Sequence, residues 1–135
     1  MTAPRDIVDL LECVLSIYFS GVRHNLRAAF ILCDETVEVT LRAKIKEEIR
    51  NPGQLSFYDL LSHTETSMNP RSHFLGKRLF VTHQTRNDMQ HNSPAAAVDV
   101  QHCADATADA VECIEHCFPG AMNAFPDRLK SLYAW

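Results

Sequence analysis

The chain has 135 residues, of which 46% are hydrophobic, and it carries a formal net charge of −4 at pH 7. This length suffices for one domain with its own hydrophobic core, and the apolar content argues against disorder. The mildly acidic balance argues against a broad, non-specific grip on nucleic acid or membrane, although a local basic patch remains open. We therefore expect a single domain over residues 1–135.

The N-terminus and the cysteines indicate a cytoplasmic protein. Asp6, Asp9 and Glu12 fall where a signal peptide would be apolar, and no stretch approaches about 18 apolar residues. The five cysteines are an odd set, which favours reduced, mostly buried thiols over a disulfide framework. We expect no membrane contact, and we expect Cys13 and Cys33, which lie among apolar residues, to be buried and unreactive.

Four long stretches carry apolar residues at spacings of three and four, a pattern typical of amphipathic helices. The first covers residues 6–19. The second covers about 22–49 and ends at Asn51-Pro52-Gly53. The third covers about 71–90, after Pro70.

The region between the second and third stretches has a weaker pattern. Residues 54–70 predict a short helix around 55–61, followed by a loop at 62–66, where Ser-His-Thr-Glu-Thr is uniformly polar.

The fourth stretch is the clearest, over about 94–118, with Ser93 as a plausible N-cap and Pro119-Gly120 closing it. Its expected inward seam begins at Val100 and ends at Cys117, and the tail 126–135 adds a turn or two. Because the breaks between helices are mostly short, we predict an all-α fold, an up-and-down four-helix bundle with a short extra helix or tail.

A candidate catalytic pair lies where the third helix ends, in TRNDMQHNSP at residues 85–94. Arg86 and His91 are five residues apart, so on an uninterrupted helix they would diverge by about 140°. They converge only if the helix ends or distorts near His91, and Asn92-Ser93-Pro94 supplies such an end. A forked guanidinium for phosphate oxygens and an imidazole that titrates near neutral pH suit metal-free cleavage of RNA by its own 2′-hydroxyl. Accidental proximity, and an arginine that complements the helix dipole, are the competing interpretation.

Neighbours of this pair are candidate substrate ligands. Asn87 is adjacent to the arginine and can orient it, while His83 and Gln90 share its helical face. Lys77 and Arg78 are the cations best placed for an RNA-facing rim, because they lie on the same helix. An ordinary solvated helix surface is the alternative for both.

The segment FLGKRLFVTHQTRNDMQH, followed by a Pro-opened, Ala-rich helix, resembles the HEPN family (higher eukaryotes and prokaryotes nucleotide-binding domains). The family hallmark is R-x(4–6)-H, usually with Asn, Asp or His directly after the Arg, and Arg86, Asn87 and His91 match it. VRHNLRAAFILCDETVEVTLRAKI is similar to the family's long early helix, with an acidic residue near its middle. The resemblance covers most of residues 5–118.

The resemblance implies a helical homodimer that joins the Arg and His of both subunits in one cleft. Many members are metal-independent endoribonucleases of toxin–antitoxin, abortive-infection and CRISPR-associated defence systems. By this resemblance Arg86 would stabilise the phosphate, His91 would act as general acid or base, and Asn87 would assist. No metal or cofactor is implied, and an antitoxin or other regulatory protein is the expected partner. A toxin subset has a modified tyrosine two residues after the His; Ser93 stands there, so that regulation is not supported.

Three alternatives remain open. Some HEPN domains are non-catalytic and serve for dimerisation or for binding a nucleotide or partner. An unrelated helical scaffold would make Arg86 and His91 incidental. A zinc site is conceivable in the late cluster of five side chains, although its cysteines lie on the apolar seam, where free Cys behaves as a small hydrophobe. The cluster comprises His102, Cys103, Cys113, His116 and Cys117.

Overall fold

The computed structural model describes residues 3–47, 52–67, 73–91 and 98–124. Within these ranges there are five α-helices, two short 3-10 turns and no strand, which confirms the all-α prediction. The elements in chain order are α1 (Ala3–Tyr18), α2 (Asn25–Ile45), η1 (Pro52–Gln54), α3 (Phe57–Ser67), α4 (His73–His91), α5 (Val100–Cys117) and η2 (Ala121–Ala124).

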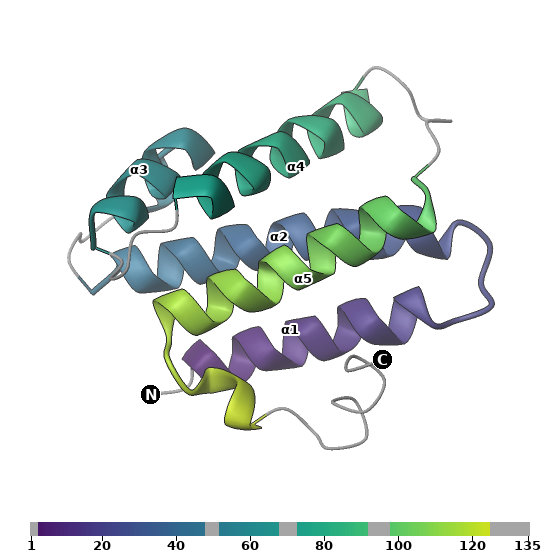
Figure 1. Ribbon diagram of the computed structural model, residues 1–135, viewed down its shortest axis with the longest axis horizontal. Coiled ribbons are helices and arrows are strands. Elements are labelled where there is room, and N and C mark those ends of the chain that lie inside the picture. Colours follow the sequence, from purple (N-terminus) through teal and green to yellow (C-terminus); the bar gives the residue numbers. More distant parts are fainter. Residues whose placement is uncertain (1–2, 48–51, 68–72, 92–97, 125–135) are drawn as a thin grey trace.

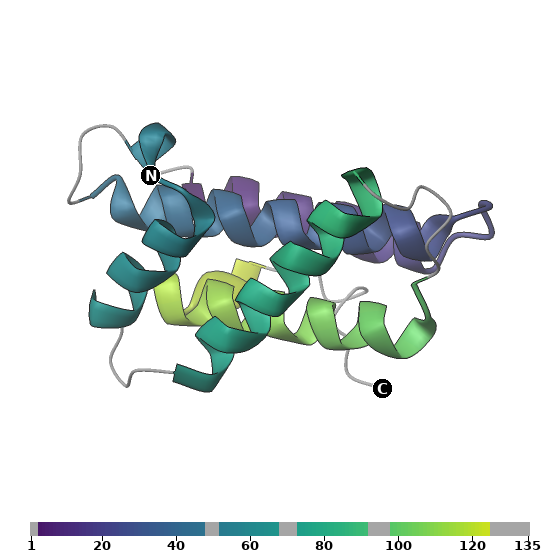
Figure 2. The same cartoon turned by 90° about the horizontal axis from the view of Figure 1, so that it is seen from above.

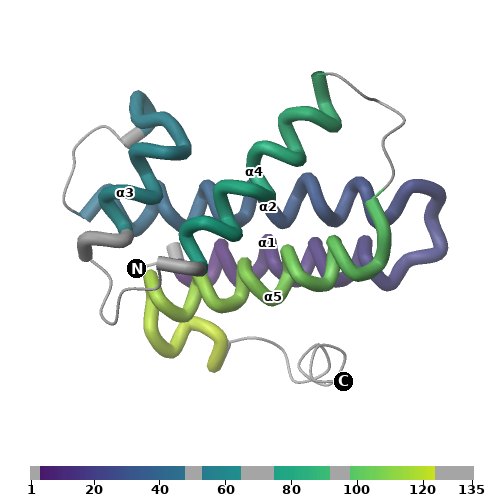
Figure 3. The backbone as a smooth tube through the Cα atoms, turned by 45° about the horizontal axis from the view of Figure 1, so that its top comes forward, coloured from purple at the N-terminus to yellow at the C-terminus, as the bar shows by residue number. Residues whose placement is uncertain are grey.

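The helix α2 is the centre of the arrangement and packs against α1, α3, α4 and α5. Figure 1 shows α1, α2 and α5 running side by side, and Figures 2 and 3 show α4 crossing obliquely over α2 and α5. The short helix α3 packs on α2 and α4, while η2 packs on α1 and α5. None of the described helices is both long enough and apolar enough to cross a membrane.

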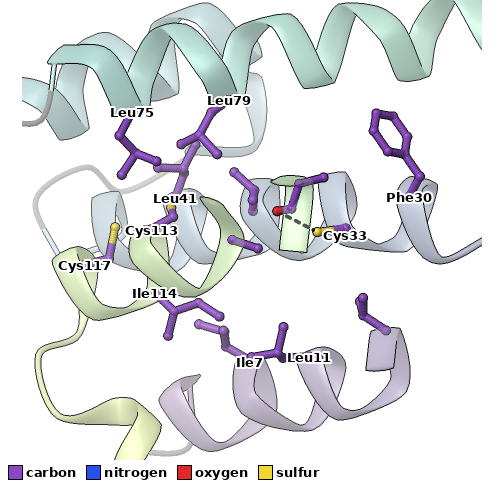
Figure 4. Packing of buried hydrophobic residues seen from close by; sticks show 14 of the residues in the cluster. Ile7, Leu11, Phe30, Cys33, Leu41, Leu75, Leu79, Cys113, Ile114 and Cys117 are labelled. Atoms are coloured by element: carbon purple, nitrogen blue, oxygen red, sulfur yellow. Dashed lines mark hydrogen bonds between the residues drawn. The ribbon is translucent and has the colours of Figure 1, made fainter. Parts of the chain in front are cut away.

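The core draws on side chains from all five helices. In Figure 4, Leu75 and Leu79 of α4 point toward Leu41 of α2 and Cys113 of α5. The large apolar side chains with less than 2% exposure are Ile7, Leu11, Val14, Leu41, Leu60, Leu75 and Ile114. Burial of apolar surface, which contributes about 25 cal/mol for each Å² removed from water, is therefore the main interaction that holds the helices together.

The helix α3 is longer than expected, and the prediction of a loop at 62–66 is wrong. Ser56 begins the helix: its hydroxyl oxygen accepts the N–H of Asp59 at 3.2 Å. Thr64 lies one turn after Leu60 and is buried, and its hydroxyl donates to the Leu60 carbonyl oxygen at 2.8 Å. One buried residue per turn thus extends the helix through a polar run.

The helix α5 begins at Val100, later than the predicted start at 94. The Asp99 backbone is extended, and its carboxylate accepts the N–H of His102 at 2.7 Å, so Asp99 is the N-cap. Val100 itself is 59% exposed, which corrects its expected inward position. The proposed cap at Ser93 lies outside the described residues, as does the tail 126–135.

Four of the five cysteines are buried, as expected, but Cys13 is exposed, which corrects the prediction for that residue. The Cys33 thiol donates to the carbonyl oxygen of Ala106 at 3.1 Å, a bond drawn in Figure 4. Burial raises the pKa of the Cys103 thiol to about 11, and it raises that of Cys33 as well. Both thiols are therefore poor nucleophiles at neutral pH.

We accordingly expect one thiol per chain to react quickly with Ellman's reagent in the folded protein, and all five to react in guanidinium. Replacing Cys13 by serine should abolish the fast phase. A fast phase that persists in the Cys13→Ser variant would contradict the burial of the other four.

Candidate functional site

Three ionisable side chains meet where α4 crosses α2. Asp34 of α2 is 1% exposed, and its Oδ2 lies 3.0 Å from Nδ1 of His83 and 3.5 Å from Nε of Arg86. Both partners come from α4, forty-nine and fifty-two residues away along the chain. A second polar contact joins the same two helices, where Arg27 of α2 donates to the carbonyl oxygen of Met89 of α4 at 3.0 Å.

Helical spacing explains how α4 presents its two members. His83 and Arg86 are three residues apart, so they point to the same side of the helix. The ring of Phe57, at the start of α3, stacks on the His83 imidazole, with centroids 4.0 Å apart and planes 6° apart. The imidazole is thus held by a carboxylate at its edge and by an aromatic ring on its face.

Burial governs the electrostatics of the cluster. Desolvation raises the pKa of the Asp34 carboxyl above its usual range, although the nearby His83 and Arg86 lower it. Glu38, one turn along α2, raises it further. Asp34 Oδ1 and Arg86 Nε are both buried without a hydrogen-bond partner among the described residues. Unpaired buried polar atoms cost stability, so the cluster is not optimised for folding alone.

Arg86 and Asn87, both predicted site residues, are in direct contact. Arg86 Nη1 donates to Oδ1 of Asn87 at 2.9 Å, and 23% of the arginine side chain is exposed. The guanidinium therefore spans from the buried carboxylate of Asp34 to the surface. A cation fixed in this way is already oriented for an anion that approaches from solvent.

His91 is not brought to Arg86 within one chain. The helix α4 continues to His91, so the two side chains diverge by about 140°. Arg86 faces α2, whereas His91 is exposed at the end of α4. Within one chain, therefore, the structure does not bring these two side chains together.

The remaining predicted residues lie at different places on α4. Lys77 is exposed, and Gln90 is exposed in the last turn. Arg78 forms ion pairs with α5: its Nε lies 2.9 Å from Oδ1 of Asp109, and its Nη2 lies 3.0 Å from Oε2 of Glu112. Two carboxylates thus balance the charge of Arg78, whereas Lys77 keeps a solvent-facing ammonium group.

Replacing Arg78 by alanine should cost less than about 1 kcal/mol of unfolding free energy, because nearly half of the Arg78 side chain (47%) is exposed to solvent. It should also raise the pKa of Asp109 further, since burial already raises that pKa and Arg78 opposes the shift. Urea denaturation and carboxyl NMR titration measure these two effects. A loss of several kcal/mol would contradict the surface character of the pair.

The late His and Cys residues do not gather into a metal site: no group of three or more metal-binding side chains occurs in the described parts of the chain. The cysteines of α5 are buried. His102 pairs with Asp99 at 3.1 Å, and His116 lies 3.7 Å from Glu112. Each histidine thus has a carboxylate neighbour on its own helix.

A groove of about 360 Å³ opens between α4 and α5. Its lining is mostly apolar, with polar groups around it. The lining residues are Phe30, Val81, Thr82, Thr85, Asp88, Met89, Val98, His102, Asp105 and Ala106. Sequence patterns did not indicate this groove.

Asp34 and Phe57 were also missed as site residues. The sequence does place Asp34 between Cys33 and Val37, on the side of α2 that faces the core. Since an unpaired carboxylate is rarely buried, that position could have indicated that Asp34 has a partner. Phe57 gave no such signal, since an aromatic residue at a helix start is most simply explained as part of the core.

Comparisons with protein-family models, curated proteins and solved structures found no match for the chain.

Proposed function

We propose that the chain is a metal-independent endoribonuclease of the HEPN type, acting in a toxin–antitoxin system or in anti-phage or CRISPR-associated defence. In this proposal α1, α2, α4 and α5 are the four helices of an up-and-down bundle, and α3 is the extra helix. The active form is a cytoplasmic homodimer, regulated by an antitoxin or another partner protein.

The observation that carries the proposal is the placement of Arg86. Its guanidinium is anchored on the buried Asp34, contacts Asn87 and remains partly exposed. Such a group binds the non-bridging oxygens of a phosphodiester, and it stabilises them more as charge builds up on attack by the 2′-hydroxyl. Cleavage in this way leaves a cyclic phosphate and needs no metal.

The divergence of Arg86 and His91 supports a dimeric site. Because His91 ends α4 and faces solvent, the histidine of one copy can serve the arginine of another without changing either helix. In this arrangement Arg86 binds the phosphate and His91 transfers a proton. Lys77, at an exposed position on the same helix, adds positive potential for the RNA backbone.

The test is incubation of the purified chain with mixed cellular RNA in EDTA, followed by analysis of the product ends. We expect 2′,3′-cyclic phosphate and 5′-hydroxyl ends, at a rate that EDTA leaves unchanged. Absence of cleavage, or cleavage that needs an added divalent metal, would overturn the proposal.

A second candidate is a non-catalytic HEPN-like module that dimerises and binds a nucleotide or a protein partner. The apolar groove between α4 and α5 favours it, since such concave surfaces are common ligand sites. Under this alternative, a groove substitution such as Val81→Trp, at an exposed lining position, would abolish binding, while Arg86→Ala would leave binding intact. Calorimetry with nucleotides distinguishes the two candidates.

A further inference from the structure

We infer that His83 is the general base of this site and that Asp34 is its positioning residue, so that His91 serves as the general acid. The inference rests on the proposed ribonuclease function. It assigns to one subunit a base and a phosphate ligand that are already assembled, and it leaves the partner to supply the acid.

The contact with Asp34 fixes which imidazole nitrogen is available. The adjacent guanidinium of Arg86 favours the ionised form of Asp34. An ionised carboxylate only accepts hydrogen bonds, so in this state the 3.0 Å contact places the proton of a neutral His83 on Nδ1. Nε2 then carries the lone pair. It has no hydrogen-bond partner among the described residues, and 14% of the side chain reaches solvent. The stacked ring of Phe57 prevents the imidazole from rotating away.

His83 is also close to the phosphate ligand. Its Nδ1 and the Nε of Arg86 both contact Oδ2 of Asp34, so the two nitrogens cannot be farther apart than the sum of 3.0 Å and 3.5 Å. A phosphodiester bound to the exposed part of Arg86 therefore lies near the imidazole of the same chain. His91, about 140° around α4, has no such relation to Arg86 of its own chain.

The reaction step balances without any other reactant. Nε2 of His83 takes the proton of the ribose 2′-hydroxyl while that oxygen bonds to phosphorus, and the bond from phosphorus to the 5′-oxygen breaks. The leaving 5′-oxygen takes a proton from the imidazolium of His91 of the second copy. The products are a 2′,3′-cyclic phosphate and a 5′-hydroxyl, and water restores the protonation states of both histidines.

Stacking on Phe57 and contact with Asp34 would also suit a histidine with a purely structural role. The test therefore uses kinetics to show whether His83 acts as the general base and His91 as the general acid. RNA with a 5′-bridging sulfur has a leaving group that needs no protonation. The variants are His83→Gln, His91→Gln and, as matched control, His116→Gln, which removes a histidine of α5 that also lies beside a carboxylate, that of Glu112.

On ordinary RNA we expect His83→Gln and His91→Gln each to be slower by about 10²- to 10⁴-fold, the usual contribution of a general acid or base. On the sulfur-bridged RNA, His91→Gln should recover nearly to the wild-type rate while His83→Gln remains slow. The His116→Gln control should match wild type on both RNAs. A wild-type rate for His83→Gln, or its recovery on the sulfur-bridged RNA, would overturn the inference and leave the ribonuclease proposal standing. If the wild-type protein is inactive on both RNAs, the inference about His83 and the ribonuclease proposal are both overturned.

Because His83→Gln can weaken the fold, a measurement on the wild-type protein accompanies the kinetics. Long-range ¹H–¹⁵N NMR of the imidazoles should show neutral His83 with its proton on Nδ1. A proton on Nε2 would remove the lone pair that the base requires and would overturn the assignment whatever the variant does.

Discussion

Replacing Arg86 by alanine is expected to slow RNA cleavage by about 10²- to 10³-fold, the usual cost of removing one charge-stabilising donor from a transition state. The guanidinium of Arg86 is held in place by Asp34 and Asn87, and part of it is exposed at the surface. Arg86→Lys keeps the charge but loses the planar fork, so it should recover only a small part of the rate. The measurement is the single-turnover rate on end-labelled RNA in EDTA at fixed salt.

The matched control is Arg78→Ala, which removes an arginine from the same helix, two turns earlier. Its charge is paired with Asp109 and Glu112, so the rate should change less than about threefold. Circular dichroism gives the folded fraction of each variant, and rates are expressed per folded chain. Equal losses for both arginines would indicate a general attraction for the RNA backbone in place of a specific phosphate ligand.

The helices were predictable because burial leaves a periodic trace in the sequence. Apolar residues at spacings of three and four place α1, α2, α4 and α5 within a few residues of their observed bounds, except for the start of α5. The misplaced boundaries have local causes. Thr64, one turn after Leu60, is buried in the core and carries α3 through the polar run, and Asp99 caps α5 later than the Ser-Pro signal indicated.

The site was predictable only on its α4 side. His83, Arg86 and Asn87 lie within one and a half turns, so sequence spacing alone places them together. Asp34 could not be assigned to them, because its contact depends on where α4 crosses α2, and no local pattern encodes a crossing. The same holds for Phe57, whose ring reaches His83 from a third helix.

The pairing of Arg86 with His91 shows the limit of a linear motif. The motif gives the separation of the two residues, but the continuous helix gives them different directions. The imidazole that the fold places beside Arg86 is that of His83. A motif match and an assembled pair of side chains are therefore separate observations, and kinetics on both histidines tests them separately.

The largest expected effect on stability comes from breaking the buried pair on its arginine side. Arg86→Met leaves the Asp34 carboxylate without its guanidinium, and we expect a loss of about 3 kcal/mol at neutral pH. This value is at the low end of the destabilisation usually caused by removing one partner of a buried ion pair, because the Arg86 side chain is partly exposed. Chemical denaturation at several pH values measures it. The double variant Arg86→Met with Asp34→Asn should recover most of the loss, since it leaves no buried charge unpaired.

The pH dependence of that loss has a definite sign. Burial raises the folded-state pKa of Asp34 above its usual value of 3.8. At a pH between 3.8 and the folded-state pKa, the folded chain therefore holds a proton that the unfolded chain has released. The contribution of Asp34 to stability therefore falls as pH rises from about 3.8 through the folded-state pKa. Arg86 lowers that pKa, so Arg86→Met should extend the fall to higher pH and lose little stability near pH 4. The double variant lacks the titrating carboxyl, and the Asp34 part of the profile should vanish. A loss in Arg86→Met that is the same at every pH would show that the missing interaction is packing of the arginine stem, with Asp34 protonated throughout.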